Sequence, residues 1–144
     1  MHFQVEFSHT DMGGVMFFGR YLELAHKAYE DFVQQQLGVD WNEWFNNAEW
    51  IVPIRALHVD FLQPLRGGSE GEVQADIVEV GTSSFTHTYT IRSEMKSCAV
   101  IRLTSVFVEK KRFSKIPIPE SFRQALQKHR LTSSSGSRGG AKSE

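Results

Sequence analysis

The sequence predicts an α+β domain in which an antiparallel sheet wraps around one long helix. Two patterns predict this fold class. Residues 20–37 carry apolar side chains at three- and four-residue steps, as an amphipathic helix does. Residues 71–80, 84–93 and 99–111 instead alternate apolar and polar side chains, as half-buried strands do. Three such strands in a row indicate an antiparallel meander that packs against the helix.

The length and the composition fit one domain with a substantial core. The chain has 144 residues, of which 40% are hydrophobic, and its 11 phenylalanines and 3 tryptophans supply large apolar surfaces. The C-terminal residues are rich in serine, glycine and lysine and have almost nothing to bury. We therefore expect one domain over residues 3–128 and a flexible polar tail over residues 129–144.

The charge balance and the cysteine count argue against several classes of protein. There are 16 basic and 17 acidic residues, and a net charge of −1 is too weak to hold nucleic acid nonspecifically. Charges interrupt every hydrophobic segment, and the N-terminus lacks the features of a signal peptide. The single cysteine, Cys98, cannot form an intramolecular disulfide. We expect no nucleic acid or membrane partner and a cytoplasmic location.

The first part of the chain predicts a strand, a loop and the long helix. Residues 2–8 alternate and are expected to form a half-buried strand. The loop that follows contains Gly13 and Gly14, which allow a sharp turn. The helix is expected to end at Gly38. Its buried stripe is Tyr21, Leu22, Ala25, Ala28, Tyr29, Phe32, Val33 and Leu37.

The rest of the chain predicts the remainder of the sheet. Residues 41–47 resemble a short helical connection, and residues 50–65 form an extended region with Pro53 near its start or at an edge. After the meander, two prolines break the chain before a short helix over residues 120–129. A single sheet around one helix leaves sheet edges exposed. We therefore expect two copies to join edge to edge as a homodimer.

The loop before the helix carries a resemblance to a known family. The stretch from Phe7 to Tyr21, FSHTDMGGVMFFGRY, resembles the 4-hydroxybenzoyl-CoA thioesterase family, which has an Asp, two residues, a Gly, a hydrophobic run and a Tyr that opens the long helix. Agreement continues in residues 28–32, 53–54, 60–65 and 79–85, so the resemblance covers about residues 3–128. It implies the hotdog fold, in which the antiparallel sheet wraps the helix and dimerises edge to edge.

The resemblance implies an acyl-CoA thioesterase with an aromatic substrate. It extends to the 1,4-dihydroxy-2-naphthoyl-CoA thioesterases of quinone biosynthesis, and the loop does not separate that substrate from 4-hydroxybenzoyl-CoA. Coenzyme A is part of the substrate, so no separate cofactor is expected. A homodimer, assembled further as a dimer of dimers into a homotetramer, is the expected form.

The same resemblance assigns a catalytic role to three residues of the loop and helix. Asp11 matches the catalytic carboxylate, Gly14 the glycine of the turn, and Phe18 the residue whose backbone N–H polarises the thioester oxygen. A thioester has an electrophilic carbonyl and a good leaving group, so one carboxylate and one oxyanion donor can suffice. Taken without the resemblance, an aspartate in a glycine-rich loop is usually a turn or N-cap residue.

Five further residues are candidates for substrate binding. Tyr21 and Ser84 lie in stretches that match the family, and His58 could line the acyl pocket, although a satisfied barrel-lining histidine is the commoner case. Lys110 and Arg112 could meet the phosphates of CoA, and solvated strand ends explain them equally well. No metal is expected, because His9 and Asp11 have no third ligand at a suitable spacing.

Two other functions remain open from the sequence. A dehydratase or hydratase of the same fold would need a histidine paired with an aspartate or asparagine to move a proton at carbon. A non-catalytic module that binds acyl thioesters would keep the fold without the reaction.

Overall fold

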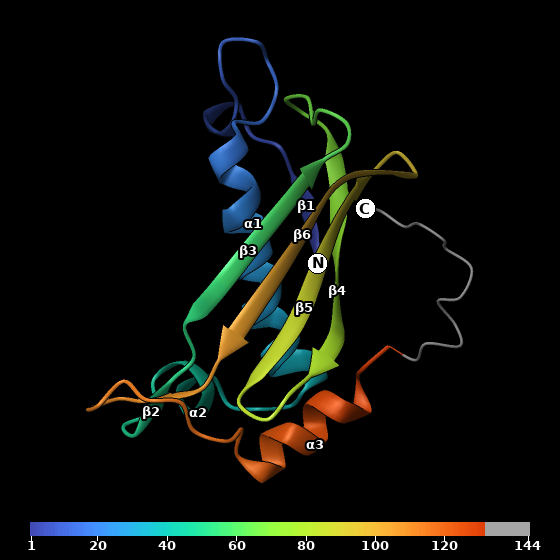
Figure 1. Cartoon of the computed structure of the whole chain (residues 1–144). Helices are drawn as coiled ribbons and strands as arrows, with labels where there is room; N and C mark the ends of the chain where they lie inside the picture. The colour runs from blue at the N-terminus through green and yellow to red at the C-terminus, as the bar shows by residue number, and fades with distance from the viewer. Residues whose placement is uncertain (132–144) are drawn as a thin grey trace.

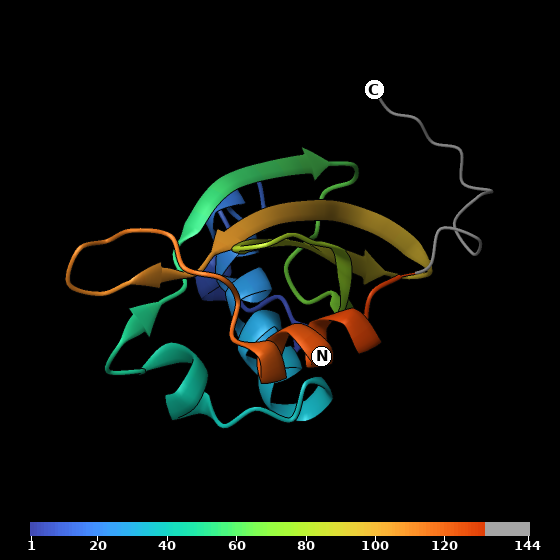
Figure 2. The same cartoon turned by 60° about the horizontal axis from the view of Figure 1, so that its bottom comes forward.

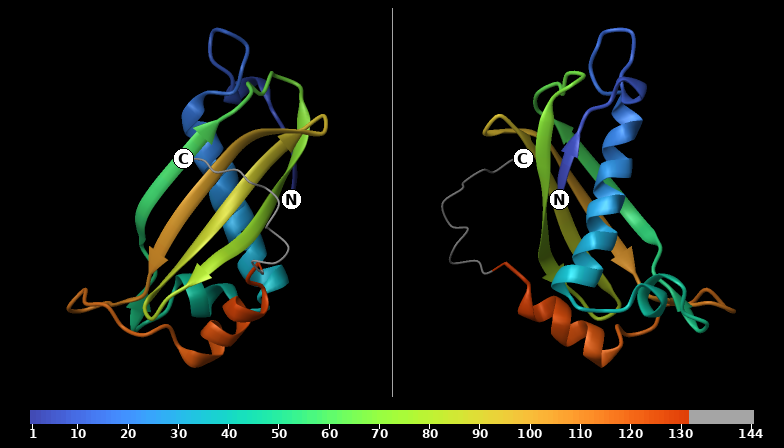
Figure 3. Two further views of the ribbon diagram at one scale, coloured as in Figure 1. Left: turned by 45° about the vertical axis from the view of Figure 1, so that its right-hand side comes forward. Right: turned by 180° about the vertical axis from the view of Figure 1, so that it is seen from behind.

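The computed structural model describes residues 1–131 and confirms the α+β fold. A five-stranded antiparallel sheet in the order β1-β4-β5-β6-β3 curls around one long helix (Figure 1). The strands are β1 (His2–Gln4), β3 (Ile54–Phe61), β4 (Glu70–Val80), β5 (Ser84–Ser93) and β6 (Lys96–Val106). Seen from behind, the helix lies in front of the concave face of the sheet (Figure 3).

The long helix begins two residues earlier than expected. It consists of α1 (Phe18–Asp31) and a π-helical segment, η2 (Phe32–Gln36), in which the Leu37 amide donates to the Phe32 carbonyl at 3.0 Å. Gly38 follows with φ of 70°, the left-handed conformation that ends a helix. The predicted stripe is buried except at Leu37, which is partly buried, and at Leu22, which stays 39% exposed because α1 leaves a groove open beside it.

The core lies between this helix and the inward-facing side chains of β4, β5 and β6. The predicted alternation is confirmed, since Ile77, Tyr89 and Ile101 are almost completely buried on the helix side. The turn helix α2 (Trp41–Phe45) then brings Trp44 into the end of the barrel, where its ring packs at 5.6 Å from Phe107. Trp44 is therefore part of the core packing at this end of the barrel.

One buried polar cluster interrupts the apolar core. His87 lies 2.7 Å from the Tyr89 hydroxyl through Nδ1 and 2.9 Å from the Ser105 hydroxyl through Nε2. Trp44 Nε1–H donates to the Tyr29 hydroxyl at 2.7 Å. Burial lowers the pKa of His87 to about 3, so its ring is neutral near pH 7. His87 is a satisfied interior histidine, as expected for a strand residue that faces the core.

Short elements close one end of the barrel. The strands β2 (Trp50–Ile51) and β7 (Val108–Glu109) form a separate two-stranded sheet, and α3 (Glu120–Lys128) packs beside them (Figure 2). Two expected strands are therefore interrupted. Pro53 separates β2 from β3, and at Phe107 the backbone turns to donate to the Ser83 carbonyl instead of to a sheet neighbour.

The domain extends slightly beyond its predicted boundary. His129 to Leu131 were expected in the tail, yet the Leu131 amide donates to the Ile77 carbonyl at 2.9 Å, and Arg130 forms a bridge with Ile77 of β4. The remaining tail, residues 132–144, lies outside the described residues. Across residues 1–131, no helix combines the length and the apolar character needed to span a bilayer.

Candidate active site

Residues 9–17, which precede the central helix, form a narrow hairpin that ends in a tight turn. Its two arms are joined because the Phe17 amide donates to the His9 carbonyl at 2.9 Å and the Asp11 amide donates to the Val15 carbonyl at 2.9 Å. The turn itself is closed by a hydrogen bond from the Gly14 amide to the Asp11 carbonyl, and Gly14 has φ of 78°. Gly14 thus supplies the left-handed residue that this turn requires.

The loop that follows β3 holds the hairpin from the side. The Met16 amide donates to the Leu65 carbonyl at 2.7 Å, and the Gly67 amide donates to the Gly14 carbonyl at 3.0 Å. These bonds hold the turn and the second arm of the hairpin, although it projects beyond the end of the sheet (Figure 1). The backbone around Asp11 is therefore positioned by tertiary hydrogen bonds as well as by its own turn.

The carboxylate of Asp11 is oriented by the next glycine. Asp11 Oδ1 accepts a hydrogen bond from the Gly13 amide at 2.8 Å, and Asp11 is exposed to solvent. A Cβ atom on Gly13 would lie 3.3 Å from this oxygen, so glycine leaves room for the carboxylate. Asp11 therefore stabilises the turn through Oδ1, as aspartates in such loops usually do. Its second oxygen, Oδ2, can attack a substrate or take up a proton.

The N-terminus of α1 follows directly after the hairpin. Phe18 is the first residue of the helix, so its amide has no carbonyl acceptor within the helix. The helix dipole adds partial positive charge at this end. Within eight residues the chain thus carries a carboxylate and a helix-terminal amide, the two kinds of group that attack on a thioester needs.

An open depression lies beside the hairpin and contains Asp11. It encloses about 1170 Å³. Its walls include Glu6, Phe7, Asp11, Met12, Gly14 and Arg66. Arg66 is exposed and lies among the lining residues with the two carboxylates of Glu6 and Asp11. The hollow therefore has room for part of a substrate, but its own side chains give it no excess of positive charge.

Tyr21 follows Phe18 by three residues on the central helix, whereas His58 lies elsewhere. Tyr21 is buried one turn into α1, and its ring packs edge-on at 5.0 Å from Phe61; burial raises the pKa of its phenol. His58 was expected to line a pocket that faces the helix. Its register opposite Arg102 instead puts it on the outer face of the sheet, where Nε2 lies 3.1 Å from Asp60 Oδ1.

Ser84, Lys110 and Arg112 lie at the opposite end of the sheet from Asp11 within one chain. Ser84 begins β5, and the loop after β7 that carries the two cations projects at the far end of the molecule (Figures 1 and 2). The Lys110 ammonium donates to the Asn47 carbonyl at 2.9 Å. Arg112 is exposed, and its amide donates to the Glu109 carboxylate at 2.9 Å. One chain therefore does not bring these residues to Asp11.

The sequence interpretation gave no role to His26 and Glu30, which meet Trp41 on the open side of the helix. His26 Nδ1 lies 3.0 Å from Glu30 Oε2, and Trp41 Nε1–H donates to Glu30 Oε1 at 2.9 Å. The signal was present, because His26 and Glu30 are four residues apart and so share a helix face.

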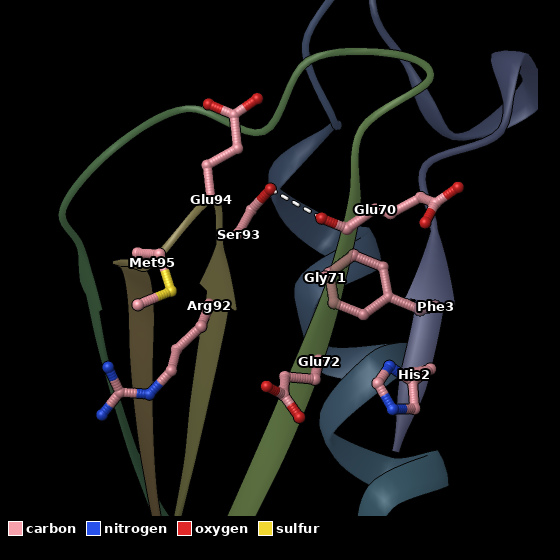
Figure 4. Close-up of a pocket in the computed structure, with 9 residues that line it drawn as sticks. All are labelled: His2, Phe3, Glu70, Gly71, Glu72, Arg92, Ser93, Glu94 and Met95. Atoms are coloured by element: carbon pink, nitrogen blue, oxygen red, sulfur yellow. Dashed lines mark hydrogen bonds between the residues drawn. The ribbon is translucent and has the colours of Figure 1, made fainter.

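A second depression lies at the sheet edge opposite β3 (Figure 4). Phe3 of β1 places its ring against Gly71 of β4, and the Ser93 hydroxyl donates to the Glu70 carbonyl at 2.7 Å. A Cβ atom on Gly71 would come within 2.2 Å of the Arg92 carbonyl oxygen. The close packing at this edge attaches the short strand β1 to the sheet.

Comparisons with known proteins identify the family of this chain. A family model described as the thioesterase-like superfamily matches residues 5–126. A 1,4-dihydroxy-2-naphthoyl-CoA hydrolase from Thermosynechococcus vestitus is 37% identical over 117 residues, which is 81% of this chain and 80% of that protein.

Solved structures of thioesterases share the fold. A 1,4-dihydroxy-2-naphthoyl-CoA thioesterase from Synechocystis has a TM-score of 0.80 at 22% identity, covering 88% of this chain and 93% of that one. A gentisyl-coenzyme A thioesterase has a TM-score of 0.77 at 25% identity, covering 88% and 98%. With the hotdog architecture and the family match over most of its length, this chain belongs to the thioesterase-like superfamily.

Proposed function

We propose that the chain hydrolyses a hydroxylated aromatic acyl-CoA, of the 1,4-dihydroxy-2-naphthoyl or 4-hydroxybenzoyl type, to the free acid and CoA. The observation that carries the proposal is the Asp11 carboxylate, oriented by the Gly13 amide on a hairpin that leads into the N-terminus of α1. The similarity to a 1,4-dihydroxy-2-naphthoyl-CoA hydrolase supports the substrate class and, through that substrate, a place in quinone biosynthesis. A cytoplasmic location stays a prediction from the sequence.

Two routes are chemically consistent with this geometry. In the first, Asp11 Oδ2 attacks the thioester carbon, the CoA thiolate leaves, and water then hydrolyses the mixed anhydride. In the second, the carboxylate removes a proton from a water molecule, which attacks the same carbon, and the tetrahedral intermediate then expels the CoA thiolate. In both routes the Phe18 amide donates to the oxyanion, and loss of one such donor typically costs about 10²–10³ in rate. Neither route needs a cofactor, because CoA is part of the substrate.

A homodimer completes this proposed site. Strand β3 is a sheet edge, and its exposed apolar side chains include Ile54, Leu57 and Phe61. A free edge with apolar side chains favours pairing with a second copy. Antiparallel pairing of two β3 strands would bring the far end of one sheet next to the hairpin of the other. Two such dimers would form the homotetramer.

The dimer gives a role to Lys110, Arg112 and Ser84, which lie far from Asp11 within one chain. In this arrangement Lys110 and Arg112 of one chain approach the depression around Asp11 of its partner, where they and Arg66 offer charge to the phosphates of CoA. Ser84 would line the same shared site. His58 lies on the outer face of the sheet, so it would meet substrate only where another subunit covers that face.

A panel of acyl-CoAs with a thiol-detecting reagent tests the activity. We expect release of CoA from hydroxylated aromatic thioesters to be faster than from long-chain ones. A single turnover in H₂¹⁸O tests for the nucleophilic route, because label enters the Asp11 carboxylate only when water cleaves an anhydride at the Asp11 carbonyl. Label in the product acid alone fits the general-base route or cleavage of the anhydride at the acyl carbonyl. No release of CoA from any aromatic thioester would disprove the proposed function.

A further inference from the structure

The phenol of Tyr21 is buried between the central helix and the loop that joins β3 to β4. Tyr21 is 4% exposed, and its ring packs edge-on at 5.0 Å from Phe61, the last residue of β3. Burial raises the pKa of the phenol, and a hydrogen bond with the Leu65 backbone partly offsets this rise. A hydrogen bond that lowers the pKa of a phenol favours the phenolate, so the Leu65 amide is the donor and the phenol oxygen is the acceptor.

Leu65 is held from its other side by the hairpin that carries Asp11. The Leu65 carbonyl accepts a hydrogen bond from the Met16 amide at 2.7 Å. The next residue of the loop continues this pairing, since Arg66 forms an antiparallel bridge with Val15 of the hairpin. One residue of the loop thus contacts the helix through its amide and the hairpin through its carbonyl.

This link joins the two groups that are proposed to act on the thioester. Asp11 lies on the hairpin, whereas Phe18 and Tyr21 lie on the first turn of α1. The covalent connection at Phe17 leaves the hairpin free to change its angle to the helix. The second attachment, through Leu65, restricts that angle, and the angle sets the distance between the Asp11 carboxylate and the Phe18 amide.

We propose that Tyr21 is a positioning residue that sets, through Leu65, where the hairpin places Asp11 relative to the Phe18 amide. This role rests on the proposed thioesterase function and gives Tyr21 a place in it other than contact with substrate. Because only 4% of Tyr21 is exposed, its side chain has almost no area left for a substrate. Loss of the hydroxyl should loosen the hairpin while the ring stays packed on Phe61.

The test begins with Tyr21→Phe, which removes the acceptor and keeps the ring. A displacement of about 1 Å at a preorganised site can cost on the order of 10² in rate, and for a smaller shift we expect kcat to fall on the order of tenfold. KM should stay within about twofold. The fall in kcat should be the same for 1,4-dihydroxy-2-naphthoyl-CoA, 4-hydroxybenzoyl-CoA and benzoyl-CoA, because the acyl group does not meet the phenol.

Tyr89→Phe is the matched control for the loss of a buried hydroxyl. Tyr89 is completely buried, and its hydroxyl lies 2.7 Å from His87 Nδ1 in the core. Each variant loses one phenol hydroxyl and one hydrogen bond, so both should lower Tm by a similar amount, on the order of 5 °C. Only Tyr21→Phe should lower kcat.

Amide hydrogen exchange measures the link without any substrate. The Met16 amide donates to the Leu65 carbonyl, so it should exchange faster once Leu65 is no longer held by the phenol. We expect its exchange to rise on the order of tenfold in Tyr21→Phe and to stay close to the wild-type rate in Tyr89→Phe.

The outcomes distinguish this inference from the proposed function. Unequal losses among the three substrates, or a raised KM with kcat unchanged, would assign Tyr21 to substrate binding and overturn the inference alone. An equal fall in kcat in Tyr89→Phe, or unchanged exchange at Met16 in Tyr21→Phe, would overturn it too and leave the thioesterase function intact. A wild type with no activity on any of the three thioesters would overturn the proposed function, and exchange at Met16 would then decide whether Tyr21 holds the hairpin.

Discussion

Asp11 and Gly13 are coupled, because the Gly13 amide donates to Asp11 Oδ1 at 2.8 Å and a Cβ atom on Gly13 would lie 3.3 Å from the same oxygen. The backbone that orients the carboxylate therefore also limits which side chain can stand beside it. Charge and position at Asp11 can thus be tested separately, by changing one residue or the other.

Removing the charge of Asp11 should abolish most of the turnover. Asp11→Asn keeps an oxygen for the Gly13 amide but cannot attack or take up a proton, so kcat should fall by about 10²–10⁴ or more, with little change in substrate binding. Asp11→Glu should also be poor, because a displacement of about 1 Å can cost on the order of 10² in rate. Asp31→Asn, at the exposed end of α1, is the matched control. Near-normal hydrolysis by Asp11→Asn would remove this carboxylate from the mechanism.

Displacing the carboxylate without removing it should have a smaller effect. In Gly13→Ala the new methyl group pushes Oδ1 by a few tenths of an ångström, so we expect kcat to fall on the order of tenfold. Gly38→Ala is the contrast, because Gly38 has φ of 70° and open space around it. It should cost about 1–2 kcal/mol in stability and leave kcat unchanged. Steady-state kinetics and thermal melts of both variants measure the difference.

A charge on the free sheet edge should prevent dimerisation. Leu57 is 49% exposed on β3, and Leu57→Glu would place an unpaired charge in the proposed contact. We expect a monomer by sedimentation at micromolar concentration, with the far-ultraviolet circular dichroism unchanged. His2→Glu on β1, the opposite edge, should remain dimeric. A wild type that sediments as a monomer would contradict the assembly altogether.

Sites shared between subunits should show complementation. Asp11→Asn and Arg112→Glu are each expected to be impaired, the second mainly through a higher KM. If Arg112 serves the partner's site, dissociating and reassociating an equal mixture should restore about a quarter of the wild-type activity, because half of the dimers then contain one intact site. If Arg112 serves its own chain, mixing should restore nothing.

The buried histidine should make the protein sensitive to acid. Burial lowers the pKa of His87 from 6.5 to about 3, so between these values the unfolded chain binds a proton that the folded chain excludes. Stability is therefore lost as the pH falls below 6.5, by about 1.4 kcal/mol per pH unit for this one group. In His87→Gln the fall between pH 6 and pH 4 should be shallower by that amount, as measured by urea unfolding at each pH. Equal slopes would show that His87 is not the source.

The strands of the meander could be predicted because each alternates cleanly over ten or more residues, as β5 does around Tyr89. The first strand was overestimated. Its alternation continues past Gln4, but the Val5 amide donates to the Ser69 carbonyl, and the chain enters a short 3₁₀ turn at Phe7. Alternation of apolar and polar residues indicates which side chains are buried, but it does not indicate whether a neighbouring strand lies within hydrogen-bonding distance of the backbone.

The two halves of the candidate site differ in how far the sequence could predict them. Asp11, Gly14 and Phe18 lie within eight residues of chain, so a local motif places them together. Arg112 comes near Asp11 only through a second subunit in the proposed assembly. A contact between two subunits cannot be predicted from a local sequence pattern. His58 was misplaced relative to the helix because a one-residue change in strand register moves a side chain to the other face of the sheet.

The π-helical segment between Phe32 and Gln36 gives the central helix one place where its length is adjustable. A π turn closes its hydrogen bond over five residues where an α turn uses four, so it accommodates one extra residue. Deleting one of the exposed glutamines there would let the segment rewind as α-helix while Gly38 and the α2 turn stay close to their present positions. Among relatives, gaps and insertions in the helix are therefore expected at this turn, and the first turn of the helix, from Phe18 to Tyr21, keeps its spacing.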